Sequence, residues 1–169
     1  MKPLFLLFCL LLLFSLSSCA KANKELINRD MELYSAMEEE INSEINRIND
    51  YMKAVVAETK KSGDMEKLKK ERGVIAKAVV KLHADSKAAG RNIESSEFKQ
   101  YHKLTLKLLD LQWAAAQNIL NSYMNKGEYG GSARKADIKY RRKIRDLKKR
   151  QERRLQRIAE ILNEDKNNK

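Results

Sequence analysis

Few side chains in this 169-residue chain are of the kinds that carry out covalent or metal chemistry. The only histidines are His83 and His102, and both cysteines fall within the first 19 residues. A di-iron site in a helical bundle needs Glu-x-x-His pairs, but Val80 and Lys99 stand three positions before the histidines. The sequence also lacks a Gly-rich phosphate loop, a Gly-x-Ser-x-Gly motif and zinc-ligand spacing. It therefore predicts a protein that is not an enzyme and binds no metal or cofactor.

Basic residues are the most concentrated chemical group, and they gather near the C-terminus. The chain has 35 Lys and Arg residues against 23 Asp and Glu residues, a net charge of +12. Residues 132–169 alone contribute 15 basic and 6 acidic side chains. Clustered cations of this kind attract anionic surfaces and partners. The candidate anion-contact residues are Arg141, Arg142, Arg145, Lys148, Lys149, Arg153, Arg154 and Arg157.

The first 19 residues combine a short apolar run with small residues that precede a cysteine. The run from Leu4 to Phe14 is eleven residues long, whereas a helix needs roughly 20 apolar residues to span a bilayer. Lys2 supplies a positive charge before the run. This is the pattern of a secretory signal peptide, expected over residues 1–18 and removed from the mature protein. The motif at its end is Leu16-Ser17-Ser18-Cys19.

This motif resembles the lipobox of bacterial lipoproteins, in which a branched apolar residue and two small residues precede an invariant cysteine. The resemblance implies transfer of diacylglyceryl to the Cys19 thiol, cleavage between Ser18 and Cys19, and acylation of the new amino group. Two or three acyl chains anchor a protein stably, whereas one chain holds it only marginally. Residues 19–22 would then form the lipidated anchor and a short tether. Ordinary secretion, with Cys19 as a free thiol, is the alternative.

The lipoprotein resemblance also implies a location. Such a protein is held at a membrane of the bacterial cell envelope, on the exported side. Ala20, and not an aspartate, follows Cys19. In a Gram-negative cell this favours the outer membrane over the inner membrane.

Beyond the tether, the sequence predicts a helical domain at 23–164 and a polar tail at 165–169. Glycine-containing breaks divide the domain into helices near 23–61, 65–90, 96–126 and 132–164. The expected N-caps are Asp64, Ser95 or Ser96, and Ser132, since their side chains accept bonds from free helical amides. Gly73 is expected to delay or bend the second helix.

Apolar residues recur at helical spacing in all four segments. The first segment repeats Ile27, Tyr34, Ile41, Ile48 and Val55 every seven positions, with Met31, Ile45 and Met52 at a second seam position. The third carries two stripes and is expected to contact partners on two sides. The last carries one narrow seam, Tyr140, Ile144, Leu147, Leu155, Ile158 and Leu162.

These patterns predict an all-α fold, an elongated antiparallel four-helix bundle that resembles a coiled coil. A three-helix bundle with a projecting fourth helix and an oligomer that shares its seams are the alternatives. Residues 25–50 hold eight acidic and two basic side chains, a balance of −6. In an up-down bundle the first and last helices are expected to be neighbours, so these acids would face the basic last helix and offset part of its charge.

The sequence therefore favours a membrane-anchored envelope lipoprotein with a structural or adaptor role. Its last helix would contact anionic lipid, lipopolysaccharide, peptidoglycan or an acidic protein partner. Nucleic acid is excluded as a partner because an exported lipoprotein does not meet the genome. One alternative is a holdase, since the composition resembles that of ATP-independent periplasmic chaperones. Another is a spacer crosslinked to peptidoglycan through Lys169, since a terminal lysine resembles that of the major lipoprotein.

Overall fold

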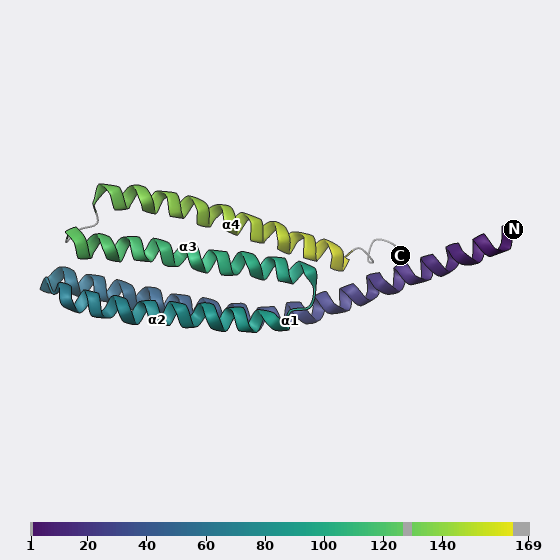
Figure 1. The fold of residues 1–169 in the computed structure, drawn as a ribbon, viewed down its shortest axis with the longest axis horizontal. Coiled ribbons are helices and arrows are strands. Elements are labelled where there is room, and N and C mark those ends of the chain that lie inside the picture. The colour runs from purple at the N-terminus through teal and green to yellow at the C-terminus, as the bar shows by residue number, and fades with distance from the viewer. Residues whose placement is uncertain (1, 127–129, 164–169) are drawn as a thin grey trace.

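The computed structural model describes the backbone of residues 2–126 and 130–163 and the side chains of residues 23–125 and 130–163. Its elements are α1 (Lys2–Ser62), α2 (Met65–Ala89), the 3-10 helix η1 (Gly90–Asn92), α3 (Ser96–Lys126) and α4 (Gly131–Asn163). Successive α-helices lie side by side and run in opposite directions (Figure 1). The prediction of an all-α, elongated antiparallel four-helix bundle is confirmed.

The first helix is longer than the sequence predicts. α1 begins at Lys2, and its N-terminal part continues beyond the ends of the other helices (Figure 1). The side chains of Ser18 and Cys19 lie outside the described part of the chain, as does the predicted tail with Lys169. The signal peptide, the lipid anchor and the crosslink therefore stay predictions. Among the residues whose structure is described, no helix has an apolar stretch long enough to cross a membrane.

The break between α1 and α2 is formed as the sequence predicts. Gly63 has φ +73°, and its amide donates to the carbonyl oxygen of Thr59 at 2.8 Å. A left-handed residue directly after a helix is the usual place for glycine, because it lacks a Cβ. The Lys67 amide donates to the Asp64 side chain at 2.8 Å, which confirms the predicted N-cap of α2.

The predicted N-cap is confirmed for α3 but not for α4. Ser95 caps α3, since its Oγ accepts from the Phe98 amide at 3.4 Å. α4 instead begins at Gly131, with the Arg134 amide donating to the Gly130 carbonyl at 3.0 Å. The predicted cap at Ser132 is wrong because the helix has already begun there. Gly73 does not delay α2, which starts at Met65.

The core lies chiefly between α1, α2 and one face of α3. All five residues of the main α1 seam are buried: Ile27, Tyr34, Ile41, Ile48 and Val55. The second seam position fails at Met31, which is 43% exposed. α3 packs against α1, α2 and α4, and this confirms that it has partners on more than one side.

α4 lies along α3 and contributes little to the core. Within its predicted seam only Ile158 is fully buried, and Leu155 is 43% exposed. The buried position near it is the polar Gln151. The alternative in which the fourth helix projects from a three-helix bundle is wrong, because α4 packs against α3 along the length of the bundle (Figure 1).

One buried hydroxyl joins three of the helices. The Tyr34 and Thr105 hydroxyl oxygens are 2.6 Å apart, and the Gln151 side-chain amide donates to Thr105 Oγ1 at 2.8 Å. These contacts place Tyr34 of α1, Thr105 of α3 and Gln151 of α4 at the same level of the bundle. They fix how far α4 is shifted along α3, and this shift determines which charged residues of the two helices lie at the same level.

A buried carboxylate ties α1 to the start of α3. The backbone amides of Glu94 and Ser95 donate to Asp30 Oδ2 at 3.0 and 2.6 Å, and Arg29 contacts Oδ1 at 3.3 Å. Burial raises the pKa of Asp30, but the hydrogen bonds from Ser95, Glu94 and Arg29 outweigh it and leave that pKa below its ordinary value. The charged form of Asp30 is thus the form that stabilises the fold.

Candidate anion-binding face

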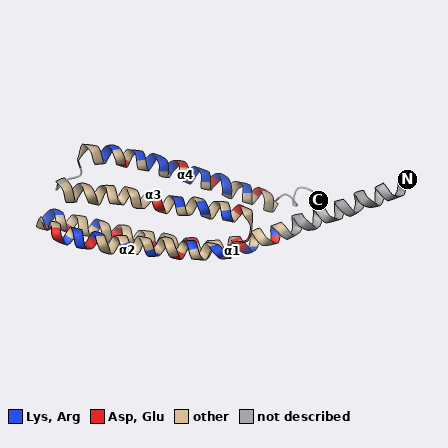
Figure 2. Ribbon diagram, viewed as in Figure 1, with Lys and Arg blue, Asp and Glu red and all other residues tan. Residues whose placement is uncertain are grey.

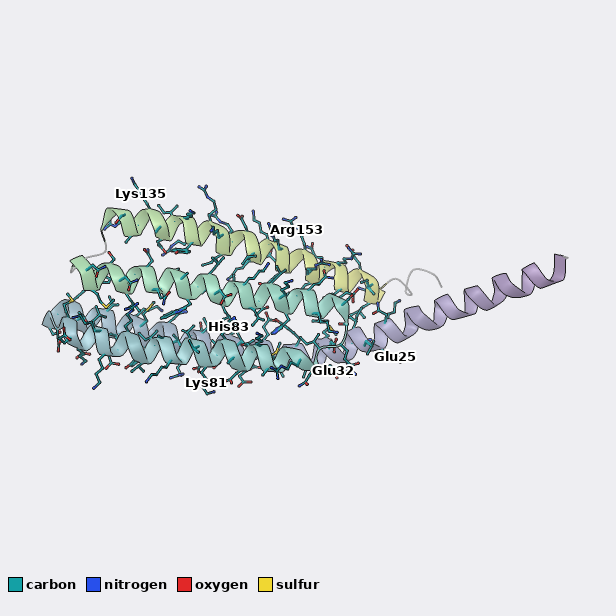
Figure 3. All side chains as sticks on the ribbon, viewed as in Figure 1. Glu25, Glu32, Lys81, His83, Lys135 and Arg153 are labelled. Carbon is teal, nitrogen blue, oxygen red and sulfur yellow. The ribbon has the colours of Figure 1, made fainter. Side chains whose placement is uncertain are left out.

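Lysine and arginine residues are concentrated along α4 (Figure 2). Arg141 donates to Asp137 Oδ2 at 2.7 Å within the helix. The other cations from position 142 to 157 form no ion pair with any residue of the described chain; they are Arg142, Lys143, Arg145, Lys148, Lys149, Arg150, Arg153, Arg154 and Arg157. Figure 3 shows Lys135 and Arg153 as they project from this helix. The face of α4 is therefore a positive surface with little internal compensation.

The predicted pairing between the acids of α1 and the bases of α4 is wrong for ion pairs, since none joins the two helices among the described residues; Glu38 and Lys148 only line the same groove. Glu44 pairs with Arg47 at 2.6 Å and Asp50 pairs with Lys53 at 2.8 Å, all within α1. Asp30 binds the start of α3 instead. The physical reason is the placement of the helices: α4 packs mainly on α3, and α3 separates most of α4 from α1.

A groove runs between α3 and the C-terminal half of α4. Its volume is about 570 Å³. We call it the cationic groove. It is lined by Gln100, Lys103, Leu104, Lys107, Arg150, Arg153, Arg154 and Arg157. Six of these eight carry a positive charge, and none is acidic. None of the six cations has an ion-pair partner within the described chain.

Helical spacing explains how these side chains come to share one groove. The four arginines of α4 lie at positions i, i+3, i+4 and i+7, which fall on one face of an α-helix. Lys103 and Lys107 are separated by one turn on α3, with Leu104 beside them. The Gln151–Thr105 hydrogen bond sets the two faces at the same level. Like charges from two helices are thus held together by the register of the bundle.

The predicted contact residues are divided among different parts of this surface. Arg153, Arg154 and Arg157 line the cationic groove. Lys148 lies on another side of α4, in a groove of about 280 Å³ that Glu38 and Glu152 also line. The remaining predicted residues, Arg141, Arg142, Arg145 and Lys149, are exposed along α4.

Three groove cations are absent from the predicted set. Arg150 belongs to the basic run of α4, whereas Lys103 and Lys107 belong to α3. A signal for the lysines is present in the sequence, because Lys99, Lys103 and Lys107 recur every four residues and so share one helix face. Sequence reasoning missed them because it treated the last helix as the only basic element.

The purely cationic part of the groove ends near Lys107. The next hollow along α3 and α4, of about 440 Å³, includes Asp110 and Asp146 beside Lys143 and Arg150. Asp110 Oδ1 also lies 3.3 Å from His83 Nε2 of α2. Acidic side chains therefore offset part of the positive charge in this hollow, whereas none lines the cationic groove.

The described residues contain no group of three or more His, Cys, Asp and Glu side chains placed to share a metal ion. Comparison with known proteins finds no matching family model, no similar curated protein and no similar solved structure. Among the described residues, the unpaired cations of α3 and α4 are the strongest chemical feature.

Proposed function

We propose that this protein is a lipid-anchored lipoprotein of the bacterial cell envelope and that its bundle serves as a structural adaptor. The Leu16-Ser17-Ser18-Cys19 motif supports the anchor. The observation that carries the adaptor role is the run of cations from Arg142 to Arg157 on α4, which have no ion-pair partner among the described residues. In this proposal α4 and the adjoining face of α3 contact an anionic envelope surface, while Cys19 holds the bundle near the membrane.

The physical basis is the combination of a stable lipid anchor with individually weak electrostatic contacts. Each Lys or Arg close to an anionic membrane contributes about 1 kcal/mol of attraction, which salt screens within a Debye length of about 8 Å at physiological ionic strength. Acyl chains on Cys19 raise the local concentration of such a surface around the bundle. Individual contacts of α4 can then be weak and still keep the adaptor in place.

The anchor is tested by changing the proposed lipid attachment site. In Cys19→Ala, transfer of lipid to the thiol cannot occur, so we expect an unprocessed precursor without incorporated fatty acid. Metabolic labelling with a fatty acid and the apparent mass of the chain report this directly. Cys9→Ala is the matched control, since it removes the other cysteine from the apolar region and should leave processing unchanged. Normal maturation and lipid labelling of Cys19→Ala would contradict the anchor.

The anionic contact is tested separately. The full chain, purified in a non-ionic detergent, is mixed with cell-wall sacculi or with anionic vesicles and sedimented at several salt concentrations. Binding should be strongest at low salt and fall steadily as salt rises, because the contact is electrostatic. Absence of binding to every anionic surface at low salt would contradict this part of the proposal, whatever the outcome for Cys19.

A further inference from the structure

We infer that the cationic groove binds phosphate-bearing headgroups of the same membrane that holds the protein's lipid anchor. This inference rests on the proposed function, because it takes Cys19 as the point of attachment. It goes further by assigning the contact to a defined site on two helices and by naming its ligand. Under this inference the bundle contacts the membrane through the cationic groove of α3 and α4, and not through the whole length of α4.

The chemistry of the groove fits phosphate groups. Four guanidinium groups offer paired N–H donors that match phosphate oxygens two at a time, and Lys103 and Lys107 add two compact positive charges. One phosphate monoester carries at most roughly two negative charges, so it would neutralise only part of the six cations. The groove is therefore suited to several neighbouring phosphates, which is how headgroups are arranged on a membrane surface.

The position of the groove favours the membrane over more distant polymers. Tyr34 is level with Gln151 through Thr105, and it lies about 23 Å along α1 from Cys19 at 1.5 Å per residue. α4 runs antiparallel to α1, so Arg157 lies about 9 Å closer to the level of Cys19 than Gln151 does. The cationic groove thus begins about 14 Å along the axis from the lipid attachment point.

The opposite end of the bundle lies much farther from the lipid attachment point. Gly63, in the turn between α1 and α2, is about 66 Å along the same axis from Cys19. The cationic groove, which takes its arginines from the C-terminal half of α4, therefore lies nearer the end of the bundle from which α1 extends toward the anchor. A tilt of α1 toward the α4 side brings this end, and not the distal turns, onto the headgroup layer.

The experiment measures stabilisation of the full chain by phosphate-bearing lipid. The protein is held in non-ionic detergent micelles, with or without added phosphatidylglycerol, and the midpoint of thermal unfolding is followed by circular dichroism. A ligand that binds only the native state raises that midpoint, by about 5 °C for a chain of this size when its sites are nearly saturated. The rise should shrink at high salt.

Matched variants locate the effect. Lys103→Gln combined with Lys107→Gln removes two groove charges from α3 and leaves the whole of α4 unchanged. Lys70→Gln combined with Lys77→Gln removes two exposed charges of α2 that have no ion-pair partner among the described residues, and it alters the net charge by the same amount. We expect the groove variant to lose at least half of the lipid-induced shift and the α2 variant to retain nearly all of it. Equal losses in both would overturn the assignment to the groove.

Two further ligands identify the source of the phosphate. Inorganic pyrophosphate is added to neutral micelles, and oleate replaces phosphatidylglycerol at the same charge. The inference expects a larger shift with phosphatidylglycerol than with either. An equal shift with pyrophosphate would make the groove a site for free anions, and an equal shift with oleate would make it a general anionic contact. Either result overturns the headgroup assignment while it leaves the proposed anionic adaptor intact.

Discussion

Among the glycines of the described chain, Gly90 is the one packed closely against another helix, at the point where the chain leaves α2. A Cβ atom built on Gly90 would lie 2.2 Å from Nε2 and 2.3 Å from Cδ2 of His102, a buried residue of α3. The φ angle of Gly90 is −63°, which any residue adopts, so the requirement is for space and not for an unusual backbone conformation. The small residue lets α3 approach the end of α2.

Gly90→Ala should therefore destabilise the protein. We expect a loss of roughly 1–3 kcal/mol in the free energy of unfolding, the usual cost of forcing extra volume into a packed site. Denaturant unfolding of the full chain measures it. Gly73→Ala is the control, since a Cβ there meets nothing within 4 Å; it should stabilise α2 by about 0.5–1 kcal/mol. Equal stability of Gly90→Ala and the wild-type protein would contradict the close packing.

His102 should make stability depend on pH in mildly acidic solution. Burial lowers the pKa of His102 from its ordinary value of 6.5. The nearby Ser86 carbonyl raises this pKa, but by less than burial lowers it. The unfolded chain then binds the proton more readily than the native chain, so stability falls as the pH drops below about 6.5. Asp30, whose pKa is lowered, affects stability only in more acidic solution, as the pH falls below about 4.

Thermal unfolding measured from about pH 7 to pH 5 tests this prediction. The wild-type midpoint should decrease over that range, and His102→Gln, which cannot take up a proton, should show a flatter dependence. His83→Gln is the control, because His83 is more exposed and lies beside Asp110. A wild-type midpoint that is constant over the range would contradict a destabilising protonation of His102.

At the scale of the helices, the contact between α1, α3 and α4 depends on the hydroxyl of Thr105. Thr105→Val keeps the shape of the side chain but leaves the Tyr34 hydroxyl and the Gln151 amide without their partner. A buried polar group without a hydrogen bond costs about 1–3 kcal/mol, so we expect a loss of roughly 2 kcal/mol or more. Thr105→Ser retains the hydroxyl and should lose less. Similar losses in the two variants would show that the methyl group, not the hydroxyl, matters.

The sequence was sufficient to predict the helices and the antiparallel packing of consecutive ones, but not that α4 packs chiefly on α3 and only slightly on α1. The seven-residue repeat of α1, from Ile27 to Val55, depends only on helix geometry, and all of its main positions are buried. The seam of α4 shows that the helix needs a partner without saying which one. A seam on α3 and a seam on α1 present the same kind of apolar surface, so periodicity cannot choose between them.

The sequence likewise predicted only the part of the candidate site that lies on one helix. Arg153, Arg154 and Arg157 could be found because they lie in a dense basic run within one helix. Lys103 and Lys107 lie about 50 positions earlier in the chain, and only the packing of α4 on α3 brings them to the same groove. The buried hydrogen bond between Gln151 and Thr105 fixes the register of α4 on α3, and this register determines which lysines and arginines share the groove. The pattern of residues within one helix does not predict that register.

At the scale of the whole molecule, charge is distributed unevenly across the bundle. The ion pairs of Glu44 and Asp50 lie within α1 and Asp30 binds the start of α3, whereas the cations of α4 from Arg142 to Arg157 have no ion-pair partner within the described chain. Lysine and arginine residues are spread along α4 (Figure 2). Positive charges that are close together and uncompensated repel one another in the folded protein. The fold thus carries an electrostatic strain that is concentrated on α3 and α4.

Added salt should therefore stabilise the isolated protein. Screening reduces the repulsion among the α4 cations, so the midpoint of thermal unfolding in neutral micelles should rise between low and physiological salt. If ion pairs between α1 and α4 held the bundle together, the same salt would lower the midpoint. Melting curves at several sodium chloride concentrations distinguish the two. The rise should be smaller in Arg153→Gln combined with Arg157→Gln, which removes part of the repulsion.

The continuity of α1 has a consequence for the chemistry of the anchor. The helix passes without interruption through Ser18 and Cys19. Cleavage between them would make Cys19 the first residue of a helix, with the amides of the first turn unpaired and a new protonated amine at the positive end of the helix dipole. Acylation of that amine, which the lipobox resemblance implies, removes the unfavourable charge. The acyl group would then stabilise the first turn of the helix as well as adding to the hold on the membrane.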